Sequence, residues 1–207
     1  MGVCSRWVAA GWCWAAFLPL AALSSPIETD VASIPHDLEI IEGVEWCKTP
    51  PAATRQYVAS GGGCELKTLT RHDRKVGPID DAVWLRMRLR NSSPDDLERW
   101  LQLGRPRHTD VTVFQSEVDG RWRSERTGYG VPRVKRSAIA AFYDVVPLQI
   151  AAGSTTEIWL RIESRSRVNL EIFLWNPSAY RGFRQTTSVM GCRRRRFGGG
   201  EGAISPP

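Results

Sequence analysis

The chain has 207 residues, of which 42% are hydrophobic and 24% are charged. This balance is typical of a soluble globular domain and argues against a multi-span membrane protein or a disordered chain. The net charge of +6 comes from 28 basic and 22 acidic residues, and four of the basic residues form the run Arg193 to Arg196. The rest of the chain is nearly neutral, so the composition predicts no nucleic-acid partner.

The N-terminus has the pattern of a secretory signal peptide. Arg6 supplies a positive charge, and Trp7 to Leu23 follow without any charge. Small residues lie at the −3 and −1 positions of a cleavage site after Ser24, which predicts residues 1–24 as a signal peptide. An uncleaved membrane anchor is the alternative, but this apolar run is short for a hydrocarbon core of about 30 Å and contains Pro19.

Residues 82–91 alternate strictly between two kinds of side chain. Val83, Leu85, Met87 and Leu89 share one face, and Trp84, Arg86, Arg88 and Arg90 share the other. A period of two over this length predicts a strand with one face in the core. The same logic places Ile158, Leu160 and Ile162 inside and Trp159, Arg161 and Glu163 outside, in contact with solvent.

Further strands follow between turn signals. They are predicted at residues 99–104, 110–117, 122–126, 138–147, 156–163 and 168–175, and residues 38–46 are predicted as a strand or a short helix. Asp119-Gly120 is a hairpin signal between two of them. Strands that recur every 10–15 residues, without a convincing helix between them, indicate an all-β antiparallel sandwich or jelly roll spanning residues 25–180.

The C-terminal part of the chain changes character after Trp175. Asn176 is a candidate N-cap for a helix that starts at Pro177 to Tyr180. The remaining residues have no apolar periodicity and many arginines, so residues 181–207 are predicted to form a disordered basic tail.

The sequence offers little that points to catalysis. The histidines His36, His72 and His108 are isolated, so neither a metal site nor a cofactor is predicted. Neither a Gly-x-Ser-x-Gly elbow nor a phosphate-binding loop is present, and Gly61-Gly62-Gly63 is interpreted as a flexible loop. The chain is therefore predicted not to be an enzyme.

Cys47 and Cys64 are the two cysteines of the predicted domain. In an oxidising compartment they could close a loop with a separation of 17 residues, which would stabilise the fold by roughly 3 kcal/mol. Two unpaired thiols are the alternative, since a sandwich of this size does not need a disulfide.

The faces that combine tryptophan and arginine are the distinctive chemical feature. If the two strands are neighbours, their outer side chains merge into one aromatic and cationic surface. Aromatic rings stack on sugars, and arginine holds carboxylates with two hydrogen bonds. The predicted ligand-binding residues are therefore Trp84, Arg86, Arg88, Trp159, Arg161 and Glu163. A plain solvent face, on which arginine stems cover the rings, is the alternative.

A family resemblance is carried by several of these segments. They are Asp81-Ala82-Val83-Trp84-Leu85-Arg86-Met87-Arg88-Leu89-Arg90-Asn91, Arg99 to Gly104, Asp110 to Phe114, Thr156 to Ser164 after Gly153, and Leu174-Trp175 before Pro177 to Tyr180. Over residues 35–180 the chain resembles the second type of extracellular sensor domain of bacterial seven-transmembrane receptors with diverse intracellular signalling modules.

This resemblance implies a periplasmic jelly roll, similar to carbohydrate-binding modules, that binds a carbohydrate or another small ligand. In the family, a membrane bundle and a signalling output follow, whereas this sequence becomes arginine-rich after Gly191. The resemblance thus implies either a receptor truncated before its membrane bundle or a free-standing sensor domain, so the membrane signalling partner would be missing from this chain. A secreted carbohydrate-active enzyme, or its non-catalytic binding module, is the alternative function.

Overall fold

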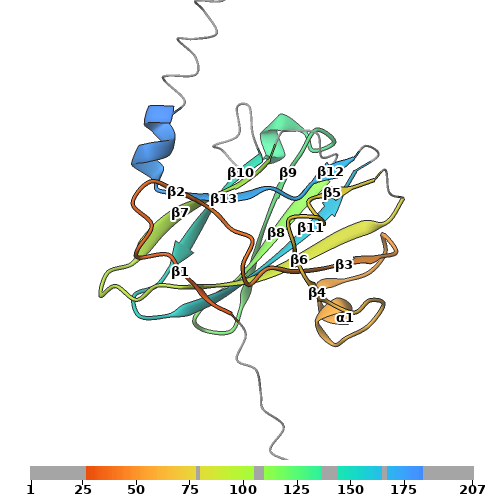
Figure 1. Cartoon of the computed structure of the whole chain (residues 1–207), viewed down its shortest axis with the longest axis horizontal. Coiled ribbons are helices and arrows are strands. Elements are labelled where there is room, and N and C mark those ends of the chain that lie inside the picture. Colours follow the sequence, from red (N-terminus) through yellow and green to blue (C-terminus); the bar gives the residue numbers. More distant parts are fainter. Residues whose placement is uncertain (1–26, 78–79, 105–109, 137–143, 165–166, 184–207) are drawn as a thin grey trace, which may run out of the picture.

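Two packed β-sheets form the body of the protein (Figure 1). The computed structural model describes residues 27–77, 80–104, 110–136, 144–164 and 167–183. The signal peptide predicted at residues 1–24 lies outside this described part. The protein is an all-β sandwich, as the strand pattern predicts.

The larger sheet has seven strands in the described part, in the order β4-β3-β6-β11-β8-β9, and β1 pairs with β6 in parallel. These strands are β1 (Thr29–Asp30), β3 (Glu45–Thr49), β4 (Lys67–Thr68), β6 (Ala82–Arg90), β8 (Asp110–Ser116), β9 (Trp122–Thr127) and β11 (Thr155–Glu163). All pairs apart from β1 with β6 are antiparallel.

The smaller sheet has the order β10-β7-β13-β2. Its strands are β2 (Asp37–Glu39), β7 (Leu97–Leu103), β10 (Asp144–Ile150) and β13 (Ile172–Trp175). A short ladder joins β5 (Lys75–Val76) to β12 (Val168–Asn169). The short helix α1 (Arg55–Ala59) lies between β3 and β4, and the 3₁₀ turn η1 (Arg133–Lys135) lies between β9 and β10. A further helix at 177–183 follows β13.

The core lies between the inner faces of the two sheets, where the alternation predicts it. Leu85 on β6 and Leu160 on β11 are directly opposite each other in the ladder, and both are completely buried. The side chains that the alternation places inside are all buried together in the main hydrophobic core. They are Val83, Leu85, Met87, Leu89, Ile158, Leu160 and Ile162. Period two therefore assigns the faces of β6 and β11 correctly.

Two strand predictions differ from the structure. The strand predicted at 138–147 corresponds to β10, which continues to Ile150; residues 137–143 lie outside the described part. Pro147 looks like a strand end in the sequence, but within the described part β10 pairs only with β7, and proline is tolerated in an edge strand. The segment predicted at 168–175 forms two strands, because β12 pairs with β5 and the chain then crosses to the smaller sheet as β13.

The turn and cap predictions are confirmed. Gly120 has a φ of +82° in the β8–β9 hairpin, which is closed by a 2.9 Å hydrogen bond from Glu117 N to Arg121 O. Residues 38–46 contribute to two strands, β2 and β3. Residues 177–183 are helical, and Ser178 N donates a 3.1 Å hydrogen bond to Oδ1 of Asn176. This helix includes 181–183, the first residues of the predicted tail, and residues 184–207 lie outside the described part.

The helix at 177–183 packs on the outer face of the smaller sheet. A separate buried cluster lies there, made of Trp100, Val145, Trp175 and Tyr180. The ring of Tyr180 meets those of Trp100 and Trp175 edge-on, with centroids 5.3 and 5.5 Å apart. Figure 1 shows this helix and α1 at opposite ends of the molecule.

Candidate functional site

The predicted ligand face lies on the outer side of the larger sheet. Strands β6 and β11 are neighbours, as the hypothesis requires, so Trp84 is opposite Arg161 and Arg86 is opposite Trp159. However, Trp84 is 0% exposed and Trp159 is 1% exposed. The expectation that both rings contact solvent is therefore wrong, although the rings do point away from the main core.

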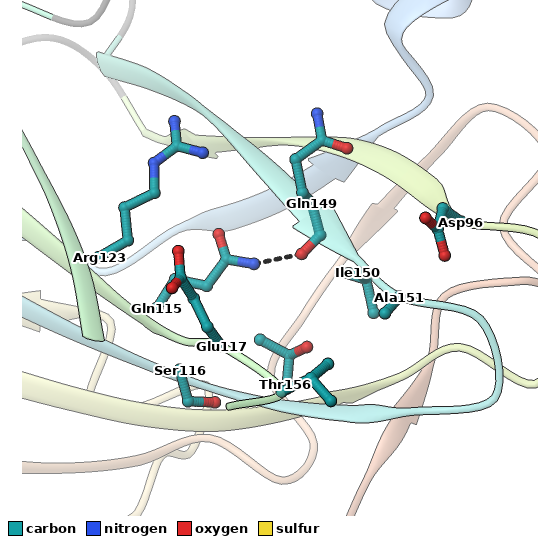
Figure 2. Close-up of a pocket in the computed structure, with 10 residues that line it drawn as sticks. Asp96, Gln115, Ser116, Glu117, Arg123, Gln149, Ile150, Ala151 and Thr156 are labelled. Carbon is teal, nitrogen blue, oxygen red and sulfur yellow. Dashed lines mark hydrogen bonds between the residues drawn. The ribbon is translucent and has the colours of Figure 1, made fainter. Parts of the chain in front are cut away.

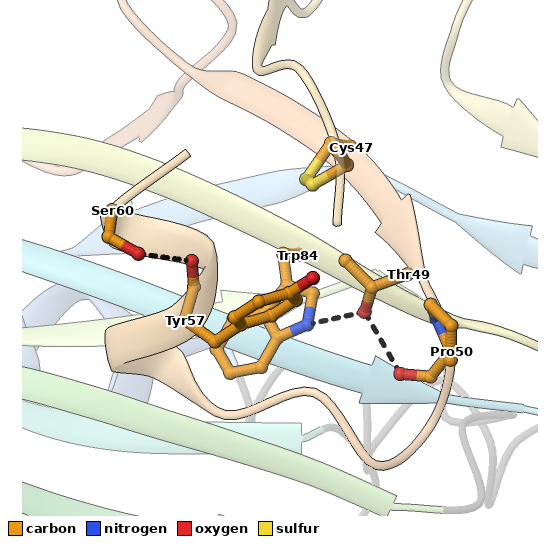
Figure 3. Close-up of a disulfide and its surroundings, with 7 residues drawn as sticks. Cys47, Thr49, Pro50, Tyr57, Ser60 and Trp84 are labelled. Atoms are coloured by element: carbon orange, nitrogen blue, oxygen red, sulfur yellow. Dashed lines mark hydrogen bonds between the residues drawn. A yellow bond between two sulfur atoms is a disulfide. The ribbon is translucent and has the colours of Figure 1, made fainter. Parts of the chain in front are cut away.

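The segment between β3 and β4 covers these rings. It carries α1, whose N-cap Thr54 accepts a 3.3 Å hydrogen bond from Tyr57 N through its Oγ1. Cys47 on β3, just before this segment, is bonded to Cys64 near the segment's end (Figure 3). A small second core results, made of Cys47, Val58, Ala82, Trp84 and Trp159, with Phe114 and Trp122 packed at its margin. Alternation predicts which face a side chain occupies but not what covers that face.

The buried indole groups are also tied by hydrogen bonds. Trp84 Nε1 donates to Thr49 Oγ1 at 3.0 Å (Figure 3). Trp159 Nε1 donates to Glu157 Oε1 at 2.9 Å. Both rings are thus fixed in the small core and are not free to stack on a ligand.

Arg86 and Glu157 form the centre of a charge network above these rings. Arg86 Nε lies 2.7 Å from Glu157 Oε1, and its Nη1 lies 3.5 Å from Glu45 Oε2. The guanidinium carbon of Arg86 also lies 5.5 Å from the centroid of the Trp159 ring. Arg86 is therefore already neutralised by neighbours within the domain.

Arg88, Arg161 and Glu163 are the remaining charged residues of the predicted ligand-binding set, and they differ in whether they have partners within the domain. Arg161 donates through Nη2 to the carboxylate of Glu163 and to the carbonyl of Pro51, so it anchors the covering segment. Arg88 is half-buried, and no hydrogen bond or ion pair to it is found within the described residues. Four of the six predicted residues thus reach the surface, and among them Arg88 retains an unused guanidinium.

Sequence reasoning misses a cation–aromatic contact beside this face. The guanidinium carbon of Arg55 on α1 lies 3.6 Å from the centroid of the Trp122 ring. Burial lowers the pKa of Arg55, and the charge of Glu157 acts in the opposite direction. This contact attaches α1 to β9, which no spacing in the sequence could reveal.

A pocket of about 200 Å³ lies elsewhere, where the edge strands of the two sheets meet. We call it the edge pocket, and Figure 2 shows it. It is lined by Asp96, Gln115, Ser116, Glu117, Val118, Arg123, Gln149, Ile150, Ala151 and Thr156. The larger sheet supplies the ends of β8, β9 and β11, and the smaller sheet supplies the end of β10 and the residue before β7.

Gln115 spans the two sheets at the base of the edge pocket. It continues the inner row of Val111 and Val113 on β8, and it is 7% exposed. Its Nε2 donates to the carbonyl oxygen of Gln149 on the unpaired edge of β10 (Figure 2). A glutamine that interrupts an apolar row is a sequence signal for this position, but its partner is distant in the chain.

A second hollow lies beside α1. It measures about 320 Å³ and is lined by Val58, Ala59, Gly61, Cys64, Glu65 and Leu66. Glu65 is its only charged lining residue. Among the described residues, no group of three or more His, Cys, Asp or Glu side chains is placed to hold a metal ion.

Comparison with known proteins assigns the chain to a family. No curated protein matches its sequence. None of the helices in the described part has the length and hydrophobicity needed to span a bilayer. Residues 63–176, more than half of the chain, match the family described as 7TMR-DISM extracellular 2, and this match runs from the disulfide loop to the end of β13. The protein therefore belongs to this family of extracellular sensor domains of signalling receptors.

Proposed function

We propose that this chain is a periplasmic ligand-binding sensor domain of a bacterial signal-transduction receptor, and that it recognises a carbohydrate or another small polar ligand. The observation that carries the proposal is the family match over residues 63–176, which include both long central strands of the sandwich. The domain itself binds and does not catalyse, and a membrane partner would pass the signal on.

Within the described part, two surfaces that carry several polar groups are available to such a ligand. One is the predicted face, where Arg86, Arg88, Arg161 and Glu163 are partly exposed above the buried tryptophans. Arg88 is the member of this face best suited to a new partner, because its guanidinium is unpaired among the described residues. The other surface is the edge pocket, which is concave and carries several polar groups.

Export is part of the proposal, because an extracellular sensor has to cross the inner membrane. The charged and apolar start of the chain supports a signal peptide at residues 1–24. N-terminal sequencing of periplasmic material should find a chain that begins near Ser25. An intact Met1 on that material would contradict cleavage.

Thermal melting with a panel of glycans and organic acids tests the sensing function. A ligand at a hundredfold excess over its Kd stabilises the folded state by about 2.7 kcal/mol, so its effect on the melting temperature is measurable. Arg88→Ala should reduce this effect if the predicted face is the site. Arg90→Ala is the matched control, because Arg90 is exposed at the end of the same strand.

A hydrolysis assay on the same glycans separates the sensor from the carbohydrate-active enzyme that the sequence leaves open. We expect binding without turnover. Release of reducing sugar by the purified chain would favour the enzyme. A panel that leaves the melting temperature unchanged throughout would count against sensing of this ligand class.

A further inference from the structure

The edge pocket contains a polar group whose hydrogen bonding is incomplete. Gln115 is 7% exposed, and its Nε2 is committed to the carbonyl oxygen of Gln149. A carbonyl cannot donate to another carbonyl, so this contact fixes which end of the amide faces β10. The side-chain oxygen of Gln115 lies on the other side, and no donor for it is found in the described part of the chain. Because Gln115 lines the pocket, this free oxygen can accept a hydrogen bond from a ligand that donates.

Two carboxylates at the rim of the pocket also have free oxygen atoms. Asp96 uses Oδ1 to accept a 2.8 Å hydrogen bond from Ala152 N, which leaves its Oδ2 available. Glu117 uses Oε2 to pair with Arg121 at 3.4 Å, which leaves its Oε1 available. Figure 2 shows Asp96 and Glu117 on different sides of the pocket, with Ile150 between them in the view.

The cationic group of the pocket is already engaged. Arg123 is the only arginine or lysine among the ten lining residues, and its Nη2 pairs with Glu125 on the same strand. The lining therefore carries the two negative charges of Asp96 and Glu117 against the one positive charge of Arg123, and both Glu117 and Arg123 already have an ion-pair partner. An organic dianion would meet net repulsion here, whereas a cation would meet attraction.

The apolar part of the lining limits what else can bind. Val118, Ile150 and Ala151 provide aliphatic contact, and the lining contains no aromatic residue on which a sugar ring could stack. The volume of about 200 Å³ corresponds to roughly seven water molecules of about 30 Å³ each. The pocket therefore suits a short aliphatic molecule with donor groups at its ends.

We propose that the edge pocket binds a small ligand through an ammonium group. An ammonium has three N–H donors and no acceptor. The pocket offers acceptors on both of its sides: the free carboxylate oxygen of Asp96 on one side, and the side-chain oxygen of Gln115 and the free carboxylate oxygen of Glu117 on the other. The proposal rests on the sensing function and names the site and the ligand class; the ammonium can belong to an amine or to an amino acid.

Five probe compounds separate charge from size and shape. Four have a four-carbon chain: 1,4-diaminobutane, 4-aminobutanoic acid, succinate and 1,4-butanediol. Glucose is the fifth. Each is titrated into the full purified chain and followed by calorimetry and thermal melting at low and high salt. We expect 1,4-diaminobutane or 4-aminobutanoic acid to bind and raise the melting temperature, with affinity that falls as salt rises. Stronger binding of the amino acid would show that Arg123 contributes.

Charge-neutralising variants locate the site. Asp96→Asn combined with Glu117→Gln should weaken binding of the ammonium compound at least tenfold, because both substitutions keep the size and remove the charge. Asp119→Asn is the matched control, because Asp119 belongs to the same hairpin but does not line the pocket. This control should bind as the natural protein does.

The outcomes separate this inference from the sensing function. If neither ammonium compound binds, or if the double variant binds them unchanged, the inference is overturned. If glucose, succinate or a glycan binds in that case, only the ammonium site is rejected and the proposed sensing function is retained. A chain that binds none of these compounds contradicts both.

Discussion

Trp84 on β6 donates a 3.0 Å hydrogen bond from its indole Nε1 to Oγ1 of Thr49 on β3, and both residues are buried. The hydroxyl of Thr49 in turn lies 3.1 Å from the carbonyl oxygen of Pro50, to which it donates (Figure 3). Thr49 thus joins the larger sheet to the start of the segment that covers it.

Replacing Thr49 by Val should destabilise the protein by about 1–3 kcal/mol. The substitution keeps the shape but leaves the buried indole N–H without an acceptor, which costs the desolvation of that donor. Chemical denaturation measures the change in the free energy of unfolding. Thr68→Val, at an exposed strand position, is the control and should change stability by less than about 0.5 kcal/mol. Equal effects of the two variants would mean that the indole finds another partner.

The facing pair Leu85 and Leu160 should be among the most sensitive positions of the core. Both are completely buried and directly opposite in the β6–β11 ladder. Replacing either one by Ala should cost about 2–5 kcal/mol, because each change leaves a cavity in the main core. Val134→Ala, at a position that is 92% exposed, should be close to neutral. A loss below about 0.5 kcal/mol at Leu85 would contradict its core position.

These inner rows could be predicted because a period of two fixes which side chains share a face. The cover over Trp84 and Trp159 could not be predicted in the same way. Residues 50–66 show no periodicity, and their position depends on the bond between Cys47 and Cys64 and on contacts with strands far away in the sequence. Cys47 is directly opposite Trp84 in the β3–β6 ladder, a relationship that exists only once the sheet has formed.

The edge pocket could not be predicted from the sequence, for a similar reason. Asp96, Gln115 and Ile150 belong to three separate segments, and only the meeting of the two sheet edges brings them together. The one local signal is Gln115, which takes an inner position after two valines. A polar residue at such a position needs a partner, but the sequence does not name Gln149.

The disulfide should be needed to hold the cover in place. Its loop has a sequence separation of 17, for which chain entropy predicts a contribution of about 3 kcal/mol. Replacing both Cys47 and Cys64 by Ala should lower the free energy of unfolding by about this amount. Limited proteolysis should then cut first within residues 50–66. Unchanged resistance there would show that the contact between Arg55 and Trp122 and the packing of Val58 suffice without the disulfide.

Acid should weaken the attachment of β1 to the sandwich. The hydroxyl of Ser92 and the N–H of Ala32 donate to Asp30 at 2.6 and 3.0 Å, and these hydrogen bonds lower the pKa of its carboxyl group. The folded state therefore binds this proton less readily than the unfolded state does. The resulting stability is fully present above the usual pKa of about 3.9 and is lost as the pH falls through the lower folded value.

The test compares the pH dependence of unfolding in Asp30→Asn with that of the natural protein. The variant cannot ionise at this position, so its stability should fall less steeply below about pH 4. Ser92→Ala removes the strongest of the hydrogen bonds and should give an intermediate slope. A slope that stays the same in Asp30→Asn would mean that other carboxyl groups account for the whole acid effect.

The charge network on the predicted ligand face should contribute more to stability through Glu157 than through Glu45. Glu157 accepts from Arg86 Nε at 2.7 Å and from Trp159 Nε1 at 2.9 Å, whereas Glu45 lies 3.5 Å from Arg86 and is more exposed. Removing the charge of Glu157 leaves a half-buried guanidinium without its closest counter-charge, which is more costly than the loss of an exposed ion pair.

Glu157→Gln keeps an oxygen that can accept from Trp159, so it isolates the effect of the charge. We expect it to lower the free energy of unfolding by about 1 kcal/mol, and Glu45→Gln to lower it by less than about 0.5 kcal/mol. High salt should reduce the difference between the two variants only in part, because salt screens partly buried pairs less than exposed ones. If both variants lose the same small amount, Arg86 is sufficiently hydrated to do without Glu157. The predicted face would then be able to exchange its internal partner for a ligand carboxylate at little cost.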